Sequence, residues 1–367
     1  MSEAGDVVPA AVVPVLPKDY SKTPQELVTE FWDKYFSKKP GKVTSVFPRS
    51  LYASLLPPPN TRGSHKGVNA AESYEKAAKQ CRDEVARIVR ECNRTNEKFT
   101  DADFDIEADQ LARNCLNGLT TDENDSPGSV HRLDWIFEKP EFTKEGYSSS
   151  DIKQGCAGNC WWLAAVASIA HRKDLMNKIC VARNEECGVY GFVFYRDGEW
   201  ISTVVDDNLY LKSKDFGADY DVYDPNLKKA KDWRKANQTG SEALYFGQCS
   251  DPNETWLPLM EKAYAKVHGD YSAISGGFSG EGIEDMTGGV STTVISNRVL
   301  SKDKLWKELA CSDGDLVFAC GADRKGWADE KAGLALGHAY SILKATEEVD
   351  EDGNKVRLVQ IRFVLHD

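Results

Sequence analysis

The sequence has few histidines and no long apolar run, and both shortages limit what the protein can be. Six of the 367 residues are histidine, so the side chains that titrate near neutral pH are few. No stretch approaches the roughly 18–20 consecutive apolar residues of a membrane span. Residues 1–18 lack the basic start of a secretory signal. Lys and Arg are outnumbered 46 to 58 by Asp and Glu, and the net charge of −12 argues against a nucleic-acid partner.

The ten cysteines are scattered and do not form the framework of a small disulfide-rich domain. Two close pairs, Cys156 with Cys160 and Cys180 with Cys187, could in principle bind zinc. No histidine lies near them at ligand spacing, which argues against a zinc site. The pattern favours reduced thiols, so we expect a cytoplasmic protein.

The composition divides the chain into four segments. Residues 1–65 hold a Val- and Pro-rich start, a short helix from Thr23 and a Pro-rich linker, and we expect this segment to be mainly disordered. Residues 66–98 contain an amphipathic helix, predicted over 69–97, that we expect to pack on the next domain. Residues 99–279 and 280–367 are predicted to form two lobes of one larger unit.

The predicted elements indicate an α+β fold. We expect a helix after Cys160, a strand pair at 189–195 and 200–205, a helix at 256–267, and strands at 315–321, 338–345 and 356–362. Residues 100–147 are expected to be irregular, and strands to dominate from 290 onward. The order predicts a helical half that carries Cys160, then a β half, with a cleft between two lobes.

Cys160 lies where a glycine-rich loop gives way to an alanine-rich apolar stretch. This transition predicts a cysteine at the N-terminus of a buried helix. The helix dipole and free backbone N–H groups there favour the thiolate, which is the nucleophilic form. The alternative is a buried structural cysteine, and the local pattern alone leaves both interpretations open.

A cysteine nucleophile needs a base, and His338 is the histidine best placed to provide one. It follows Gly337 and opens a predicted strand, so its ring can project into a cleft. Taken alone, a strand histidine is more often part of the core. The other five have less informative surroundings: His65, His131, His171, His268 and His366.

Five motifs in colinear order resemble the calpain family. They are QGCAGNCWWLAA at 154–165, VDD at 205–207, EKAYAK at 261–266, GIEDMTGG at 282–289 and GHAYS at 337–341. The resemblance covers roughly 99–362. It implies a papain-like, calcium-dependent cysteine endopeptidase that acts on protein substrates.

The resemblance also implies roles for single residues. Cys160 would be the nucleophile and His338 the base, while Gln154 and the backbone N–H of Cys160 would donate to the oxyanion. Gly277 and Gly337 would let the substrate backbone approach closely. One departure is that Asn159 stands where the family usually has aspartate.

For calcium, the resemblance implies Gly146, Asp151 and Glu254, with a further backbone carbonyl at Lys144. Oxygen ligands of this kind suit Ca²⁺. Without the resemblance these would be a turn glycine and solvated acids. The acidic segment 350–354 resembles part of an EF-hand loop but lacks its flanking helices, so we predict a hairpin turn there.

The resemblance stops after Arg362. The family continues with Asn-Pro-Trp-Gly, and its asparagine orients the catalytic histidine, whereas here Phe363 occupies that position. Phenylalanine accepts no hydrogen bond from imidazole, so weak or absent proteolytic activity is expected. The abrupt change predicts an altered 3′ end of the coding sequence.

Two other functional classes compete with the protease. One is a catalytically inactive calpain-like protein that binds partners or regulates a paralogue. The other is a papain-fold acyltransferase such as a transglutaminase, which the motifs at 154–165 and 337–341 disfavour. Because Cys160, His338 and Gln154 are all present, the sequence favours the enzyme.

Overall fold

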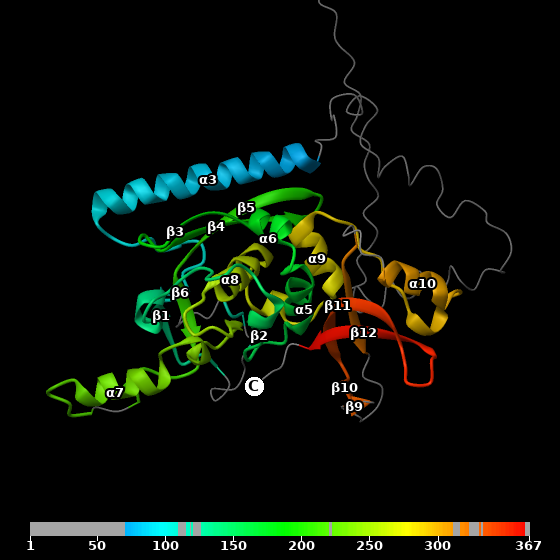
Figure 1. Ribbon diagram of the computed structural model, residues 1–367. Coiled ribbons are helices and arrows are strands. Elements are labelled where there is room, and N and C mark those ends of the chain that lie inside the picture. Colours follow the sequence, from blue (N-terminus) through cyan, green and yellow to red (C-terminus); the bar gives the residue numbers. More distant parts are fainter. Residues whose placement is uncertain are drawn as a thin grey trace, which may run out of the picture. The chain divides into compact units, whose positions relative to one another are not determined.

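The computed structural model describes residues 70–108, 115–117, 119, 126–219, 222–310, 316–322, 330–331 and 333–363 (Figure 1). They belong to one compact unit, Val68–Asp367. The disorder and the short helix predicted within 1–65 lie outside the described residues. Over the described ranges, no helix is both long enough and apolar enough to cross a membrane.

A three-stranded antiparallel sheet organises the first half of the unit. It consists of β3 (Cys180–Asn184), β4 (Val189–Arg196) and β5 (Glu199–Asp206), in the order β3-β4-β5. The β4–β5 turn is Asp197-Gly198, with φ of 52° and 88°, as a two-residue hairpin requires. The predicted strand pair is therefore confirmed.

Helix α3 (Ala70–Thr95) lies along this sheet and contacts all three strands, which confirms the helix predicted to pack on the next domain (Figure 1). Gly191 of β4 permits the close approach, since a Cβ there would lie 2.5 Å from Cys81 Sγ. The buried Cys81 thiol donates to the carbonyl of Phe192 at 3.7 Å. Burial raises the pKa of Cys81 to about 12, so this thiol stays protonated.

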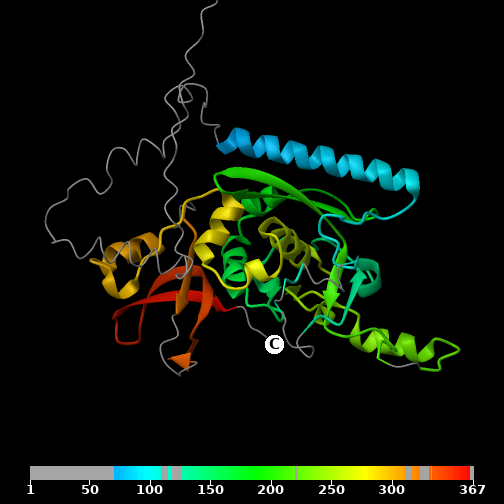
Figure 2. The same ribbon diagram turned by 180° about the vertical axis from the view of Figure 1, so that it is seen from behind.

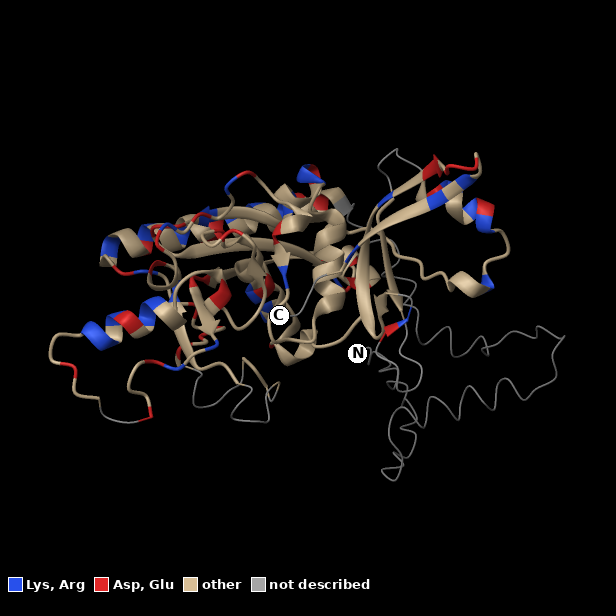
Figure 3. Cartoon of the chain, turned by 60° about the horizontal axis from the view of Figure 1, so that its bottom comes forward, with Lys and Arg blue, Asp and Glu red and all other residues tan. Residues whose placement is uncertain are grey.

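The helices α5 (Cys160–Ile169), α6 (Lys173–Ile179), α8 (Trp256–His268) and α9 (Ser279–Thr287) lie on the side of the sheet away from α3, as both views show (Figures 1 and 2). Their apolar side chains form the main core, in which Trp162, Trp256 and Tyr264 are fully buried. Acidic and basic residues are interspersed along the outer helices (Figure 3). The predicted helices at Cys160 and at 256–267 are confirmed.

A second antiparallel sheet follows in the order β12-β11-β8, with β8 (Phe318–Ala322), β11 (His338–Val349) and β12 (Lys355–Phe363). The β11–β12 connection is a hairpin turn, in which Asp350 N–H donates to the carbonyl of Asn354 at 2.9 Å. Asp350 Oδ1 accepts the N–H of Asn354 at 2.7 Å. This confirms the predicted hairpin turn at 350–354.

The remaining elements are short. The strands pair as β1 (Ser129–Arg132) with β6 (Asn208–Leu211), β2 (Ile152–Lys153) with β7 (Gln248–Cys249), and β9 (Glu330–Lys331) with β10 (Leu334–Ala335). The helices are α4 (Leu133–Ile136), α7 (Lys228–Asn237) and α10 (Lys302–Leu309), and 3₁₀ turns lie at Ser149–Asp151, Ser241–Ala243, Ser272–Ile274 and Ser296–Arg298.

The mixed helices and strands confirm the α+β class, but two local expectations were wrong. Residues 100–147, expected to be irregular, contain β1 and α4, and β1 gains its partner strand from a distant segment. Strands dominate from 290 onward, as expected, and α10 also forms there, with Ser301 as its N-cap accepting from Lys304 N–H at 3.2 Å. The half predicted as helical also carries the β3-β4-β5 sheet.

Candidate active site

Cys160 is the first residue of α5, at the positive end of the helix dipole, as its sequence context predicted. The nine residues that follow it in the helix are all buried, whereas Cys160 itself is partly exposed. The carbonyl of Asn159 accepts the first helical N–H groups, those of Trp162 at 3.0 Å and Leu163 at 3.1 Å. The helix therefore holds the thiol at its accessible end, where a nucleophile is required.

Gln154 lies in the loop that leads to Cys160 and is buried. Its Nε2 donates to the carbonyl of Ala157 at 2.7 Å, and within the described residues its Oε1 has no hydrogen-bond partner. A second hydrogen bond holds the same loop, from the N–H of Cys156 to the carbonyl of Tyr245 at 2.8 Å. One of the two N–H groups of Gln154 Nε2 is therefore used within its own loop, and the other is left to donate to a substrate oxygen.

His338 opens β11 and pairs with Ala322 of β8. Its Nδ1 is buried and has no hydrogen-bond partner in the described part of the chain. Phe363 lies beside the imidazole, with ring centroids 5.2 Å apart and the planes at 82°. The aromatic ring that stands at the asparagine position of the motif thus packs edge-on against the histidine and offers it no acceptor.

The helix of Cys160 and the strand of His338 pack against one another, since α5 contacts β8, β11 and β12. Ser168 of α5 also donates its hydroxyl to the carbonyl of Phe318 in β8 at 3.1 Å. No hydrogen bond between the side chains of Cys160 and His338 is present among the described residues. The structure therefore brings the two elements together without closing a thiol–imidazole pair.

The two predicted substrate glycines come from different halves of the unit. Gly277 precedes α9 and packs over Trp161, where a Cβ would lie 2.6 Å from the indole ring. Gly337 has a φ of 77° and donates its N–H to the carbonyl of Ala322 at 2.7 Å. Each glycine is exposed and lies next to a predicted catalytic element, Gly277 beside α5 and Gly337 before β11.

The predicted calcium residues lie near one another in the first half. Glu254 is buried, accepts the N–H of Lys144 at 2.7 Å, and has a raised pKa owing to burial and to repulsion by Asp151 and Asp251. Burial also raises the pKa of Asp151, while Arg362 opposes this. Gly146 adopts a φ of 96°, which favours glycine.

This donor set contains only oxygen atoms, and its acids repel one another, so a divalent cation would relieve the repulsion. In the described ranges no group of three or more His, Cys, Asp or Glu side chains is arranged to hold a metal ion. A site there would therefore combine the carboxylates of Asp151 and Glu254 with backbone carbonyls. The sequence did not single out Asp251, which pairs with Lys144 Nζ at 3.2 Å.

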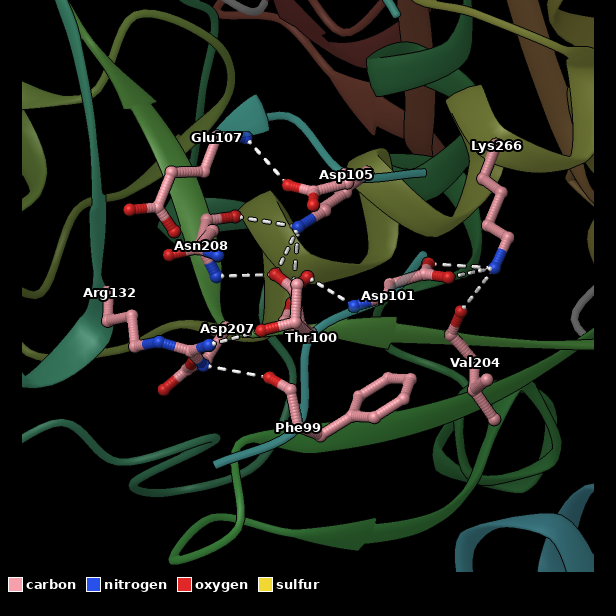
Figure 4. Close-up of polar contacts among 12 residues, drawn as sticks. Phe99, Thr100, Asp101, Asp105, Glu107, Arg132, Val204, Asp207, Asn208 and Lys266 are labelled. Carbon is pink, nitrogen blue, oxygen red and sulfur yellow. Dashed lines mark hydrogen bonds and ion pairs between the residues drawn. The ribbon is translucent and has the colours of Figure 1, made fainter. Parts of the chain in front are cut away.

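A buried ionic network joins α8 to neighbouring segments of the chain (Figure 4). We had predicted no individual role for its residues from the sequence. Lys262 and Asp206 are both fully buried and joined at 2.7 Å, and Lys262 also donates to the carbonyl of Asn208 at 2.9 Å. Lys266 donates to both carboxylate oxygens of Asp101, at 2.8 and 2.7 Å. Two turns of α8 are thereby fixed to β5, to the start of β6 and to the segment that follows α3.

Comparison with known proteins agrees with the motifs. A family model described as "Calpain family cysteine protease" matches residues 99–363. The calpain-2 catalytic subunit of Bos taurus is 29% identical over 313 residues, which cover 81% of this chain and 39% of the relative. Human calpain-9 is 29% identical over 285 residues, 75% of this chain and 36% of that protein. The calpain-1 catalytic subunit of Sus scrofa is 33% identical over 235 residues, 62% and 29% of the two chains.

The family match and these relatives define a cysteine protease domain with mixed helices and strands. The chain belongs to the calpain family. It spans about two fifths of the length of the first of these relatives.

Proposed function

We propose that this chain is the protease domain of a calpain-type cysteine endopeptidase that hydrolyses peptide bonds of cytoplasmic proteins and depends on calcium. The observation that carries the proposal is the placement of Cys160, the accessible first residue of an otherwise buried helix. Helix α5 packs against the strand that His338 opens. A papain-like arrangement of two lobes is part of the proposal.

In the proposed reaction the Cys160 thiolate attacks the carbonyl carbon of the scissile peptide bond. His338 holds the thiol proton and passes it to the leaving amine as the C–N bond breaks, which leaves a thioester. Water, deprotonated by His338, then hydrolyses the thioester and restores the thiol. Gln154 Nε2, through the N–H that Ala157 does not accept, and the Cys160 N–H would donate to the oxyanion in both steps.

We further propose that activity is low, because no hydrogen bond from the described residues fixes Nδ1 of the His338 imidazole. Its Nδ1 lacks a hydrogen-bond partner among the described residues, and its neighbour Phe363 supplies only an apolar ring. In other triads the third residue holds the imidazole in the right tautomer and orientation, and losing it lowers turnover strongly without abolishing it.

A direct test is cleavage of an unstructured protein such as casein by the purified chain, with Cys160→Ala as the matched control. We expect slow cleavage that stops in the control and after treatment with a thiol-directed epoxide. Equal cleavage by the control would assign the hydrolysis to a contaminant and contradict the proposal.

The second candidate function is an inactive calpain-like protein that binds or regulates a partner. One observation favours it, the Phe363 ring that lies beside His338. It predicts no cleavage of casein with or without calcium, and no preferential reaction of Cys160 with the epoxide. A positive result in either assay rejects it.

We propose that calcium binds through the carboxylates of Asp151 and Glu254 and through backbone carbonyls near Gly146 and Lys144. The carboxylates of Asp151 and Glu254 would hold the ion, whose positive charge would relieve the repulsion between them. Arg362 of β12 donates to the carbonyl of Ser150 at 3.2 Å, so this turn also contacts the histidine half.

Asp151→Asn is therefore expected to raise the calcium concentration for half-maximal thermal stabilisation about tenfold, since one ligand charge is worth on the order of 1.4 kcal/mol. Thermal unfolding at increasing calcium, with a magnesium series alongside, measures this. The control is Glu351→Gln in the exposed β11–β12 turn, which should respond as the unmodified chain does. If calcium stabilises Asp151→Asn and the unmodified chain at the same concentrations, the proposed calcium site is wrong.

A further inference from the structure

Glu261 of α8 carries a carboxyl group that the proposed mechanism does not use. Its side chain is completely buried. Its Oε2 accepts the N–H of Gly247 at 2.7 Å, and its Oε1 accepts the side-chain amide of Asn159. No ion pair to Glu261 occurs within the described ranges, because the adjacent Lys262 points instead to Asp206.

Both partners of this carboxyl belong to the structure around Cys160. Asn159 is the N-cap of α5 and directly precedes Cys160. Gly247 follows the segment whose Tyr245 carbonyl accepts the N–H of Cys156, near the start of the same loop. A side chain at position 247 would meet Glu261, since its Cβ would lie 2.8 Å from Oε2.

The element that carries Glu261 is rigidly held. Ion pairs of Lys262 with Asp206 and of Lys266 with Asp101 fix α8, and Figure 4 shows the second of them. Glu261 therefore presents fixed acceptors, with one oxygen bonded to Asn159 of the loop 154–160 and the other to Gly247.

We propose that Glu261 is a positioning residue for Cys160, holding the start of α5 through Asn159 and the neighbouring loop through Gly247. The inference rests on the proposed function only in taking Cys160 as the nucleophile. It gives a physical role to the asparagine that departs from the family motif.

Asn159 suits a carboxyl group that changes its protonation state. The ionised carboxylate accepts N–H groups from both partners, whereas the protonated acid must donate one hydrogen bond. Asn159 Oδ1 is buried without a hydrogen-bond partner among the described residues, so rotating the amide by half a turn supplies the acceptor. An aspartate there would place two carboxyl groups in contact, and one would have to bind a proton.

Burial raises the pKa of Glu261 from 4.5 to about 7, against the hydrogen bonds from Gly247 and Asn159. The folded state thus holds this proton more tightly than the unfolded state. The resulting stabilisation is present below pH 4.5 and is lost as the pH rises through about 7. The titratable side chain that feels the Glu261 charge is Tyr271, whose pKa it helps to raise behind the larger effect of burial.

The test measures the rate at which iodoacetamide alkylates Cys160, by mass spectrometry of its peptide, between pH 5.5 and 9. Glu261→Met removes both acceptors and is expected to slow alkylation about tenfold. Glu261→Gln keeps the shape and, after Asn159 turns, one bond to each partner. It should restore the rate to within about twofold of the unmodified chain.

The pH profile separates positioning from simple structural support. Because Glu261 bonds to Asn159, the residue before Cys160, Glu261→Gln removes a negative charge from the surroundings of the loop that carries the thiol, and the midpoint of Cys160 alkylation should move to lower pH. The matched control Glu281→Gln, an exposed acid on α9, should leave the midpoint in place. If Glu261→Met does not fold, the pH midpoint of Cys160 alkylation in Glu261→Gln tests the positioning role alone.

An unchanged midpoint in Glu261→Gln, or an unchanged rate in folded Glu261→Met, would overturn the proposal. Alkylation of Cys160 requires no peptide hydrolysis. The assay can therefore contradict the proposed function and the positioning role of Glu261 independently of one another. If Cys160 of the unmodified chain reacts no faster than the other cysteines, the proposed function fails. If Cys160 is reactive but insensitive to both variants, only the role of Glu261 fails.

Discussion

Replacing Phe363 with asparagine is expected to raise the rate of peptide-bond cleavage by this chain about 100-fold. Phe363 lies 5.2 Å from His338, edge-on to the imidazole, and His338 Nδ1 is buried without a hydrogen-bond partner in the described residues. An asparagine side-chain oxygen at this place can accept a proton from the imidazole, which fixes the tautomer and leaves the other ring nitrogen free to act on the thiol. Correct placement of a general base contributes typically 10²–10⁴-fold to rate.

The matched control is Phe363→Leu, which removes the ring without adding an acceptor. Phe363 also packs on Tyr340, with centroids 5.1 Å apart, so both variants should lose a similar amount of thermal stability. The rate should rise only with asparagine. Equal rates in the two variants would mean that ring bulk, not the missing acceptor, limits the reaction.

Lys262→Met is expected to lower the free energy of unfolding by about 3–5 kcal/mol, the usual cost of removing one partner of a buried ion pair. Lys262 and Asp206 are fully buried, and the lysine also satisfies the carbonyl of Asn208. Methionine fills the space but leaves Asp206 as an unpaired buried charge. Denaturant unfolding followed by circular dichroism measures the loss.

Two controls define the origin of that loss. Lys79→Met breaks an exposed ion pair with Asp83 on α3, 2.6 Å long, and should change stability little because solvent screens it. Combining Lys262→Met with Asp206→Asn removes the stranded charge and should recover part of the loss. No recovery in the double variant would show that the lysine stabilises the fold through packing alone.

Elements with a local signal were predictable from the sequence. The Asp197-Gly198 turn between two apolar runs indicated the β4–β5 hairpin, and apolar spacing indicated α3 and α8. Strand β1 and helix α4 were not predictable in this way. β1 is four residues long and gains its place by pairing with β6, some 80 residues further along the chain.

The candidate active site also has parts that the sequence predicted and parts that it did not. The transition from loop to apolar stretch predicted that Cys160 begins a helix, and the structure places it there. The motif comparison also led to Phe363, which packs against His338. Glu261 and Asp251 make their contacts with residues that are distant in the sequence. A pattern within one segment cannot predict such contacts.

The central claim, that Cys160 and His338 form a nucleophile–base pair, is tested most directly by competitive alkylation of all ten cysteines with iodoacetamide, quantified by mass spectrometry. Burial raises the pKa of Cys81 and of Cys180 to about 12, and those thiols should react slowly. Cys320 serves as the reference thiol within the chain, since the residue is exposed even though burial of its sulfur raises its pKa.

We predict that Cys160 reacts at least about tenfold faster than Cys320 at pH 7, since only the thiolate attacks. In His338→Ala this advantage should disappear. Reaction of Cys160 at the rate of Cys320, or an advantage that survives in His338→Ala, would contradict the account.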